Sequence, residues 1–190
     1  AQGFVTSPSP VVLPMLALGA LWVILWQGRL RFLGLAPIAL AFVLWQGATR
    51  PDVLIADSGA LVGVMGDDGR ALSKARGAGF VARTWLENDG DGADQAGAAA
   101  RWPGDQTVVR KITLSNEKTL VHVQGKRGSE AYPICRKDDI VIANKDWIGQ
   151  GPCEVFDQAR LRETGSIALV SDTVKTARDA TGARLWNTKR

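Results

Sequence analysis

The sequence predicts a two-helix transmembrane hairpin followed by a mainly-β (α+β) soluble domain. Two observations lead to this fold class. Two long uncharged stretches near the N-terminus are separated only by a short segment that carries two arginines. In the rest of the chain, short apolar runs alternate with turns rich in Gly and Asp, which is typical of a domain built from short strands. We therefore place the hairpin in residues 1–50 and the soluble domain in residues 51–190.

The hairpin prediction depends on the absence of charge. Neither Ala1–Gly28 nor Phe32–Thr49 contains Asp, Glu, Lys or Arg. Neither stretch carries a polar stripe at helical spacing, as a helix on the surface of a soluble protein would. Extending them to Ser9–Gln27 and Leu30–Ala48 gives each the length of a membrane span, about 17–25 residues. The alternative is a buried helical hairpin in a soluble core.

Residues typical of a membrane surface lie near the ends of both expected helices. Trp22, Trp26 and Trp45 occupy positions where interfacial aromatic side chains gather. Arg29 and Arg31 lie in the connection, and arginine in a short loop favours the cytoplasmic side. We therefore expect this loop in the cytoplasm and the C-terminal domain on the other side of the membrane, in a periplasm-like space.

The distribution of charge gives the tail no general affinity for nucleic acid. The chain has 23 basic and 19 acidic residues, a formal net charge of +4. Arg29, Arg31 and Arg50 precede the first acidic residue, Asp52, so the tail has 20 basic against 19 acidic residues, or +1. A charge this small produces no field that would gather nucleic acid.

The tail is expected to begin with a three-stranded meander. Val53–Ile55 and Leu61–Met65 are short apolar runs, and a second turn at Asp67-Asp68-Gly69 leads into Arg70–Ser73. Asp-Gly between apolar runs favours a hairpin. A helix is expected next at Phe80–Glu87, with one apolar side formed by Phe80, Val81, Thr84 and Trp85.

The rest of the tail is predicted to form an exposed loop followed by strands. The loop is expected at Asn88–Ala100, which is rich in Asp, Gly and Ala. The expected strands are Val108–Leu114, Thr119–Gln124, Ile140–Asn144, Cys153–Phe156, Ser166–Val170 and Thr173–Ala177. A short helix at Gln158–Glu163 is expected to end at Gly165.

No catalytic, cofactor-binding or metal-binding motif is found. His122 is the single histidine, whereas a catalytic zinc site usually needs two or three His and a carboxylate. A calcium loop starting at Asp89 would need Gly sixth and Glu twelfth, where the chain has Asp94 and Ala100. We therefore expect no enzymatic activity, no cofactor, no metal and no small-molecule substrate, and we assign His122 to a strand.

The two cysteines predict a disulfide. Cys135 and Cys153 form an even pair in a region expected to be exported, where disulfides persist. Antiparallel pairing of the strand after Cys135 with the strand at Cys153 would bring the sulfurs together. The closed loop would present Trp147 to a partner, or Trp147 would cap the core. The alternative is two unrelated buried thiols.

The order of several motifs resembles a known family. These motifs are Trp26-Gln27-Gly28-Arg29-Leu30-Arg31 between the helices, Pro51–Ile55 after them, Phe80–Asp91, the apolar run Ile140–Ala143 between Cys135 and Cys153, and Val155-Phe156-Asp157. Together they resemble the C-terminal region of alphaproteobacterial ComEC-family competence proteins, the inner-membrane channels for transforming DNA. The resemblance covers most of the chain, and its motifs are structural rather than catalytic.

The chain also departs from this family. Other branches carry a metallo-β-lactamase-like domain with His-x-Asp-x-Asp-His, which is absent here, so nuclease activity is not expected. Trp102–Ile112 lacks a further cysteine pair that accompanies this kind of tail, and Arg184-Leu185-Trp186 stands where Arg-Pro-Trp is usual.

The resemblance implies a function and partners. Ala1 is not Met, and the first ten residues lack the basic start of a signal peptide, so we expect the last spans of a longer polytopic protein. Its partners would be the membrane, the remaining helices of the channel and single-stranded DNA passing through it. The alternative is a stand-alone two-pass membrane protein whose outer domain binds an envelope partner. A periplasmic hydrolase would need a catalytic cluster that the sequence does not supply.

Overall fold

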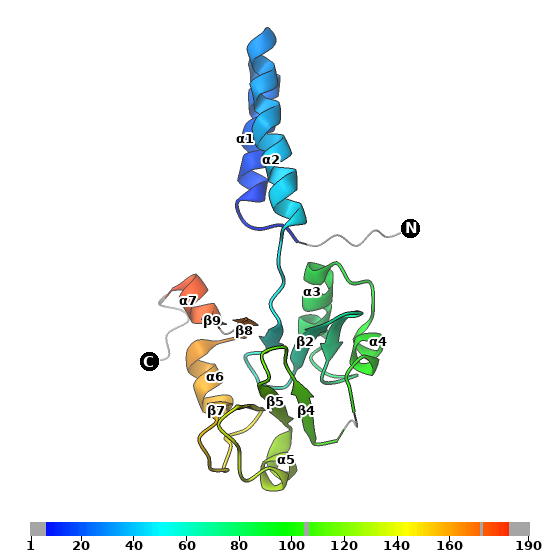
Figure 1. Cartoon of the computed structure of the whole chain (residues 1–190), viewed down its shortest axis with the longest axis vertical. Helices are drawn as coiled ribbons and strands as arrows, with labels where there is room; N and C mark the ends of the chain where they lie inside the picture. The colour runs from blue at the N-terminus through cyan, green and yellow to red at the C-terminus, as the bar shows by residue number, and fades with distance from the viewer. Residues whose placement is uncertain (1–6, 105–106, 172, 183–190) are drawn as a thin grey trace. The chain divides into compact units, whose positions relative to one another are not determined.

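The computed structural model describes residues 7–104, 107–171 and 173–182. These residues form nine strands in two sheets, seven α-helices and one 3₁₀ helix, so the chain is an α+β protein (Figure 1). The predicted motif at residues 184–186 lies outside the described residues. Two compact units are distinguished: the hairpin unit, Ala1–Arg50 with Glu87–Asp91, and the tail domain, Pro51–Leu86 with Gly92–Arg190.

Two apolar helices form the hairpin. Helix α1 is Val12–Leu25 and helix α2 is Leu35–Gln46, with the 3₁₀ helix η1, Arg29–Gly34, between them. Both α-helices are shorter than the expected spans. The chain leaves α1 at an extended Trp26 and turns at Gly28, whose φ of +78° favours glycine. Helix α1 has 14 residues, about 21 Å at 1.5 Å per residue, which is less than the hydrocarbon thickness of about 30 Å.

Close backbone contact and a tryptophan hold this hairpin together. A Cβ on Gly19 would lie 2.8 Å from the Gly34 carbonyl oxygen, and a Cβ on Gly34 would lie 2.7 Å from that of Gly19. Small residues at a helix crossing permit such an approach, as in many membrane helix pairs. At the turn, Trp22 Nε1 donates to the Leu30 carbonyl oxygen at 3.1 Å, and the Trp22 ring stacks on Trp26 at 4.5 Å between centroids.

The first sheet of the tail domain is antiparallel throughout. Its order is β3 (Gly69–Leu72), β2 (Val62–Gly66), β1 (Val53–Ile55), β8 (Ile167–Val170) and β9 (Thr173–Thr176). The predicted meander and the predicted C-terminal pair of strands are confirmed. The structure adds that β8 lies beside β1, so the last strands complete the sheet that the first strands begin.

The second sheet mixes both strand directions. Its order is β4 (Val109–Thr113), β5 (Thr119–Val123), β6 (Asp139–Ala143) and β7 (Glu154–Phe156). Strands β4 and β5 are antiparallel, but β5–β6 and β6–β7 are parallel. The expected antiparallel pairing of the strands after Cys135 and at Cys153 is therefore wrong. Helix α5, Gly125–Ala131, lies in the crossover that parallel pairing of β5 and β6 requires.

The tail domain contains more helix than the mainly-β domain that the sequence predicts. Helices α3 (Gly79–Asp89) and α6 (Gln158–Thr164) were predicted, and α6 ends at Gly165 with φ +72° as expected. Helices α4 (Gln95–Ala100), α5 and α7 (Ala177–Thr181) were not predicted.

Two features of this region, helix α4 and the packed face of α3, differ from the prediction. Residues 95–100 are not an exposed loop: the Asp94 carboxylate caps α4 by accepting from the Gly97 N–H at 2.7 Å, and two of the helix's alanines are buried. The expected apolar face of α3 is confirmed only in part. Val81 and Trp85 pack, partly buried, against the core, but the fully covered side chains are Ala82 and Leu86, and Phe80 is 84% exposed.

Three apolar clusters form the core of the tail domain. The first lies between the two sheets and includes Ile55, Leu120, Ile142 and Phe156. The second joins the five-stranded sheet to α3 and α4 through Leu61, Leu72 and Leu86. The third covers the other face of the four-stranded sheet and includes Val121, Val141 and Cys135. Each strand of the four-stranded sheet therefore sends alternate side chains into the first and third clusters.

Candidate functional site

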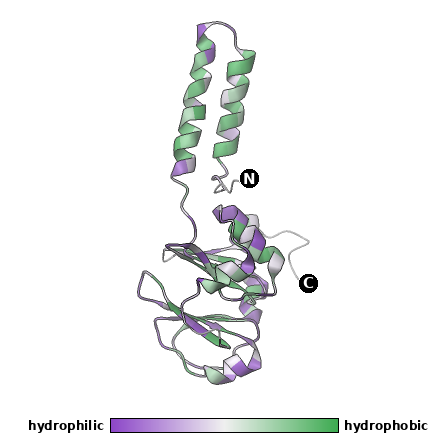
Figure 2. Ribbon diagram, turned by 90° about the vertical axis from the view of Figure 1, so that its right-hand side faces the viewer, coloured by the Kyte–Doolittle hydropathy of each residue, from purple (hydrophilic) through white to green (hydrophobic). Residues whose placement is uncertain are grey.

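The hairpin carries an apolar surface that its own packing does not cover. In the described residues, sixteen large hydrophobic side chains between residues 11 and 44 are exposed, against four in the tail domain. Leu13, Ile24 and Leu25 are 67%, 75% and 72% exposed. Figure 2 shows that both helices are hydrophobic over most of their length. Soluble monomers rarely expose a continuous apolar surface of this kind, so it marks contact with lipid or protein.

Only one described helical segment is long and apolar enough to cross a membrane. This segment is Arg29–Gln46, which joins η1 to α2, whereas Val12–Leu25 is apolar but shorter. The two arginines predicted to lie in the loop, Arg29 and Arg31, both lie in η1 at the turn of the hairpin. Arg31 also lies over the Phe32 ring, with its guanidinium carbon 5.0 Å from the ring centroid.

The disulfide between Cys135 and Cys153 is present in the structure, with 5.7 Å between the two Cα atoms. A short parallel bridge between Ile134 and Gln150 brings the two segments together. The Cys135 N–H donates to the Gln150 carbonyl oxygen at 3.0 Å, and the Gln150 N–H donates to that of Pro133 at 2.8 Å. The predicted pairing is confirmed, but the parallel bridge, rather than an antiparallel hairpin, supplies the geometry.

The disulfide-bonded loop does not present Trp147 to solvent. Trp147 is half-buried against the third cluster, and its Nε1 donates to the Tyr132 carbonyl oxygen at 3.0 Å. This tryptophan therefore caps the core, which was one of the two expected roles. The exposed apolar side chains here are Ile134 and Ile148, at 74% and 69%. The sequence does not indicate their exposure, because single isoleucines next to Pro133 and Gly149 form no periodic pattern.

Asp139 organises the start of this loop. Its Oδ2 accepts from the Tyr132 hydroxyl and from the Arg136 N–H, both at 2.6 Å. Burial, followed by the bond to Asp139, raises the pKa of Tyr132 to about 12. The Lys111 ammonium lies 4.5 Å from the centroid of the Tyr132 ring. The phenol is therefore a structural donor at neutral pH and not a general base.

His122 lies in β5, as predicted, and is fully buried. Its Nε2 lies 3.0 Å from the Gly59 carbonyl oxygen, and since a carbonyl only accepts, Nε2 carries the proton. Burial lowers the pKa of His122 to about 4, so the ring is neutral near pH 7. Gly59 has φ +63° and belongs to the turn between β1 and β2, so this bond joins the two sheets.

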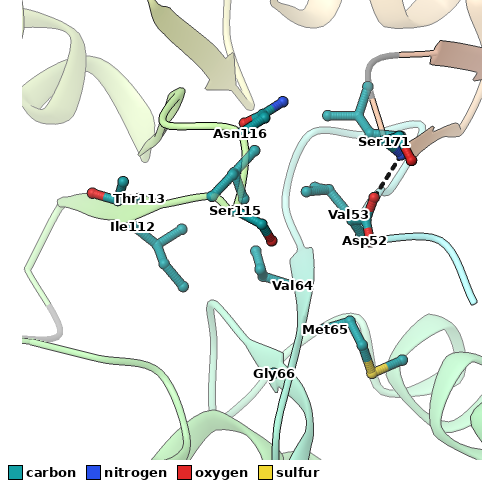
Figure 3. A pocket seen from close by; sticks show the side chains of 12 residues that line it. Asp52, Val53, Val64, Met65, Gly66, Ile112, Thr113, Ser115, Asn116 and Ser171 are labelled. Carbon is teal, nitrogen blue, oxygen red and sulfur yellow. Dashed lines mark hydrogen bonds between the residues drawn. The ribbon is translucent and has the colours of Figure 1, made fainter.

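A pocket of about 450 Å³ opens between the two sheets (Figure 3). Its walls combine Val53, Val64 and Leu169 of the first sheet with Ile112 and Thr113 of the second. At its rim the Asp52 carboxylate accepts from the Ser171 N–H at 2.6 Å. The lining therefore combines apolar side chains with the polar side chains of Thr113, Ser115 and Asn116.

No cluster of three or more His, Cys, Asp or Glu side chains that could hold a metal occurs in the described residues. Asp94, which stands where a calcium loop would need Gly, instead caps α4.

Comparisons of the chain with models of protein families, with curated proteins and with solved structures found no match.

Proposed function

We propose that this chain is part of a ComEC-like channel for the uptake of transforming single-stranded DNA across a bacterial inner membrane. In this proposal the hairpin contributes two membrane-spanning helices, and the tail is a non-catalytic periplasmic domain. The observation that carries it is the apolar surface of the hairpin, which neither α1 nor α2 covers.

The energetics of this surface support a membrane position. Fully burying one large apolar side chain is worth about 1.5–3 kcal/mol relative to exposure in water. With sixteen such side chains exposed, the hairpin has a strong drive to enter lipid or to pack against further helices. The close crossing at Gly19 and Gly34 supports the same environment, because membrane helices associate through small residues.

Two independent observations support the proposed orientation. Arg29 and Arg31 lie at the turn of the hairpin, and positive charge in a short loop favours the cytoplasm. A hairpin that turns in the cytoplasm delivers the following residues to the opposite side. There the tail carries a disulfide between Cys135 and Cys153, which is stable in an oxidising compartment such as the periplasm.

A second candidate is a two-pass membrane protein whose outer domain binds an envelope partner. Ile134 and Ile148 favour this candidate, because they are exposed apolar side chains in a segment that the disulfide holds in place, and such side chains suit contact with another protein. The two candidates differ in what the cell loses when the chain is removed.

Deleting the gene in its own host and measuring transformation tests the proposal. We expect labelled DNA still to bind the cell surface and enter the periplasm, while transformation falls to the background of a non-competent strain. A plasmid copy carrying Phe80→Ala, a change at an exposed side chain of α3, should restore it and serves as the matched control. Unchanged transformation in the deletion strain would reject the channel function and leave the envelope-partner candidate.

A further inference from the structure

Several buried nitrogen atoms of the tail domain have no hydrogen-bond partner. In the described part of the chain these include Nε and Nη1 of Arg110, Nε1 of Trp102 and Nε2 of Gln124. Arg110 is only 8% exposed, and Trp102 only 5%. Buried polar groups in native proteins nearly always have a partner, so a group of unsatisfied donors calls for a physical explanation.

Strand register brings these donors to one face of the four-stranded sheet. Arg110 in β4 lies opposite His122 in β5. The Gln124 N–H donates to the Val108 carbonyl oxygen at 2.8 Å, which extends the same ladder by two residues. Side chains alternate along a strand, so Arg110, His122 and Gln124 share the face that bears the first cluster. Trp102 belongs to that cluster too.

Among the described residues, no carboxylate forms an ion pair with Arg110. Of the other buried charged side chains, Asp139 lies on the opposite face and already accepts two hydrogen bonds. Arg70 is also buried, but its guanidinium donates to the carbonyl oxygens of Gly63 and Pro51. Burial lowers the pKa of Arg110. A buried guanidinium without a counter-charge is costly, and an anion is its natural complement.

The same place offers one acceptor. Because Nε2 of His122 donates to the Gly59 carbonyl oxygen, Nδ1 of the neutral ring is unprotonated, and it has no partner in the described residues. A ligand that matches this arrangement accepts hydrogen bonds through several oxygens and donates one through an O–H group. Hydrogen phosphate has both at neutral pH, whereas sulfate has no proton to donate.

We propose that these residues form a binding site for a small protonated oxyanion of the phosphate class. Arg110, Trp102 and Gln124 donate to its oxygens, and its P–O–H donates to Nδ1 of His122. The acceptor gives the site its selectivity, because a sulfate would leave Nδ1 unpaired and set two lone pairs against each other. This inference stands on the tail domain alone and is independent of the proposed channel function.

The test is calorimetric titration of the full chain, purified in detergent, with inorganic phosphate and with sulfate at pH 7 and constant ionic strength. We expect phosphate to bind at least tenfold more tightly than sulfate and to raise the melting temperature. Arg110→Leu should abolish both effects without lowering the melting temperature in phosphate-free buffer. Arg127→Leu removes an exposed arginine of α5 and should leave phosphate binding unchanged.

A second variant tests the acceptor. His122→Gln keeps an Nε2 donor that can reach Gly59 but removes Nδ1, so phosphate and sulfate should bind it equally. If Arg110→Leu does not fold, Arg110→Lys keeps the charge and removes the paired donors, and phosphate affinity should fall at least tenfold.

Two results would overturn the site. One is the absence of phosphate-dependent heat and stabilisation in the native chain. The other is phosphate binding that Arg110→Leu or Arg110→Lys leaves unchanged.

Competition with a 5′-phosphorylated oligonucleotide distinguishes a free phosphate ion from the terminal phosphate of a nucleic acid as the ligand. We expect no competition from it, because Arg110 is nearly inaccessible. Competition would contradict the assignment to a small free ion.

Discussion

In the hairpin unit, large apolar side chains face outward, whereas in the tail domain they face inward. The buried positions of α1, η1 and α2 are held by Val12 and by the small residues Gly19, Gly34 and Ala41. In the tail domain the fully buried positions include Ile55, Leu120 and Phe156. The two units draw on the same apolar residue types and place them oppositely. The surface of the tail domain is therefore suited to water, whereas the surface of the hairpin is suited to lipid or to contact with other helices.

The largest expected difference between the two units is in the free energy of unfolding that is lost when a large side chain is truncated to Ala. Phe156→Ala removes a fully buried ring from the first cluster and should lower the free energy of unfolding by about 3–5 kcal/mol. Leu25→Ala in α1, where the side chain is 72% exposed, should change it by no more than about 0.5 kcal/mol. Chemical unfolding of the full chain in detergent, followed by circular dichroism, measures both. Equal losses would contradict the outward assignment of Leu25.

Removing the disulfide tests the second difference between the units. Replacing Cys135 and Cys153 together by Ser releases a loop of 18 residues and should destabilise the tail domain by about 3 kcal/mol. The helicity of the hairpin should be unaffected. The same unfolding experiment, with and without reductant on the native chain, measures the effect. A native chain indifferent to reductant would show that the disulfide carries no stability.

The pH dependence of the tail domain tests the buried His122. Its folded pKa of about 4 lies below the ordinary value of 6.5, so between pH 6.5 and 4 the unfolded chain binds a proton that the folded chain does not. Stability should therefore fall on acidification through this window, by up to about 3 kcal/mol at about 1.4 kcal/mol per pKa unit. Titration in chloride buffer measures this loss. His122→Gln should remove this component of the slope, and an unchanged slope would assign it to carboxylates.

The smallest expected loss of stability comes from placing a larger side chain at Gly19, where the two sides of the hairpin cross. Gly19→Val places methyl groups where the backbone and Ile38 already lie, and should cost about 1–3 kcal/mol. Ala20→Val, at an exposed position of the same helix, should cost much less. Loss of helicity during titration with a denaturing detergent compares the two. Identical curves would mean that α1 and the turn do not meet at Gly19.

Local signals account for the parts of the fold that the sequence predicted. Asp-Gly turns define the meander, and Gly165 ends α6, because each acts on neighbouring residues. The capping box of Thr176 and Asp179 at α7 is a signal of the same kind and could have been found. Helices α4 and α5 contain one and two glycines, which weaken any helical pattern.

Non-local pairing accounts for what the sequence did not predict. Nothing near β1 indicates that β8 lies beside it, and the bond from His122 to Gly59 spans 63 residues. The parallel pairing of β6 had one sequence signal, a continuous apolar run at Ile140–Ala143, which is typical of strands buried on both faces. The disulfide was predicted from the even number of cysteines and the expected oxidising compartment, and it is present. The antiparallel strand pairing expected to bring the cysteines together was wrong, because it depends on contacts between distant residues.

In the proposed topology the hairpin spans a membrane, with its turn in the cytoplasm and the tail domain outside. Single cysteines at exposed positions, Gln27→Cys in the turn and Asp67→Cys in the tail, test it with an impermeant thiol reagent, since the native cysteines are bonded. In cells with a permeabilised outer membrane, Asp67→Cys should react at once and Gln27→Cys only after the inner membrane is broken. The reverse pattern would contradict the orientation, and reaction of both in intact inner membranes would contradict the span itself.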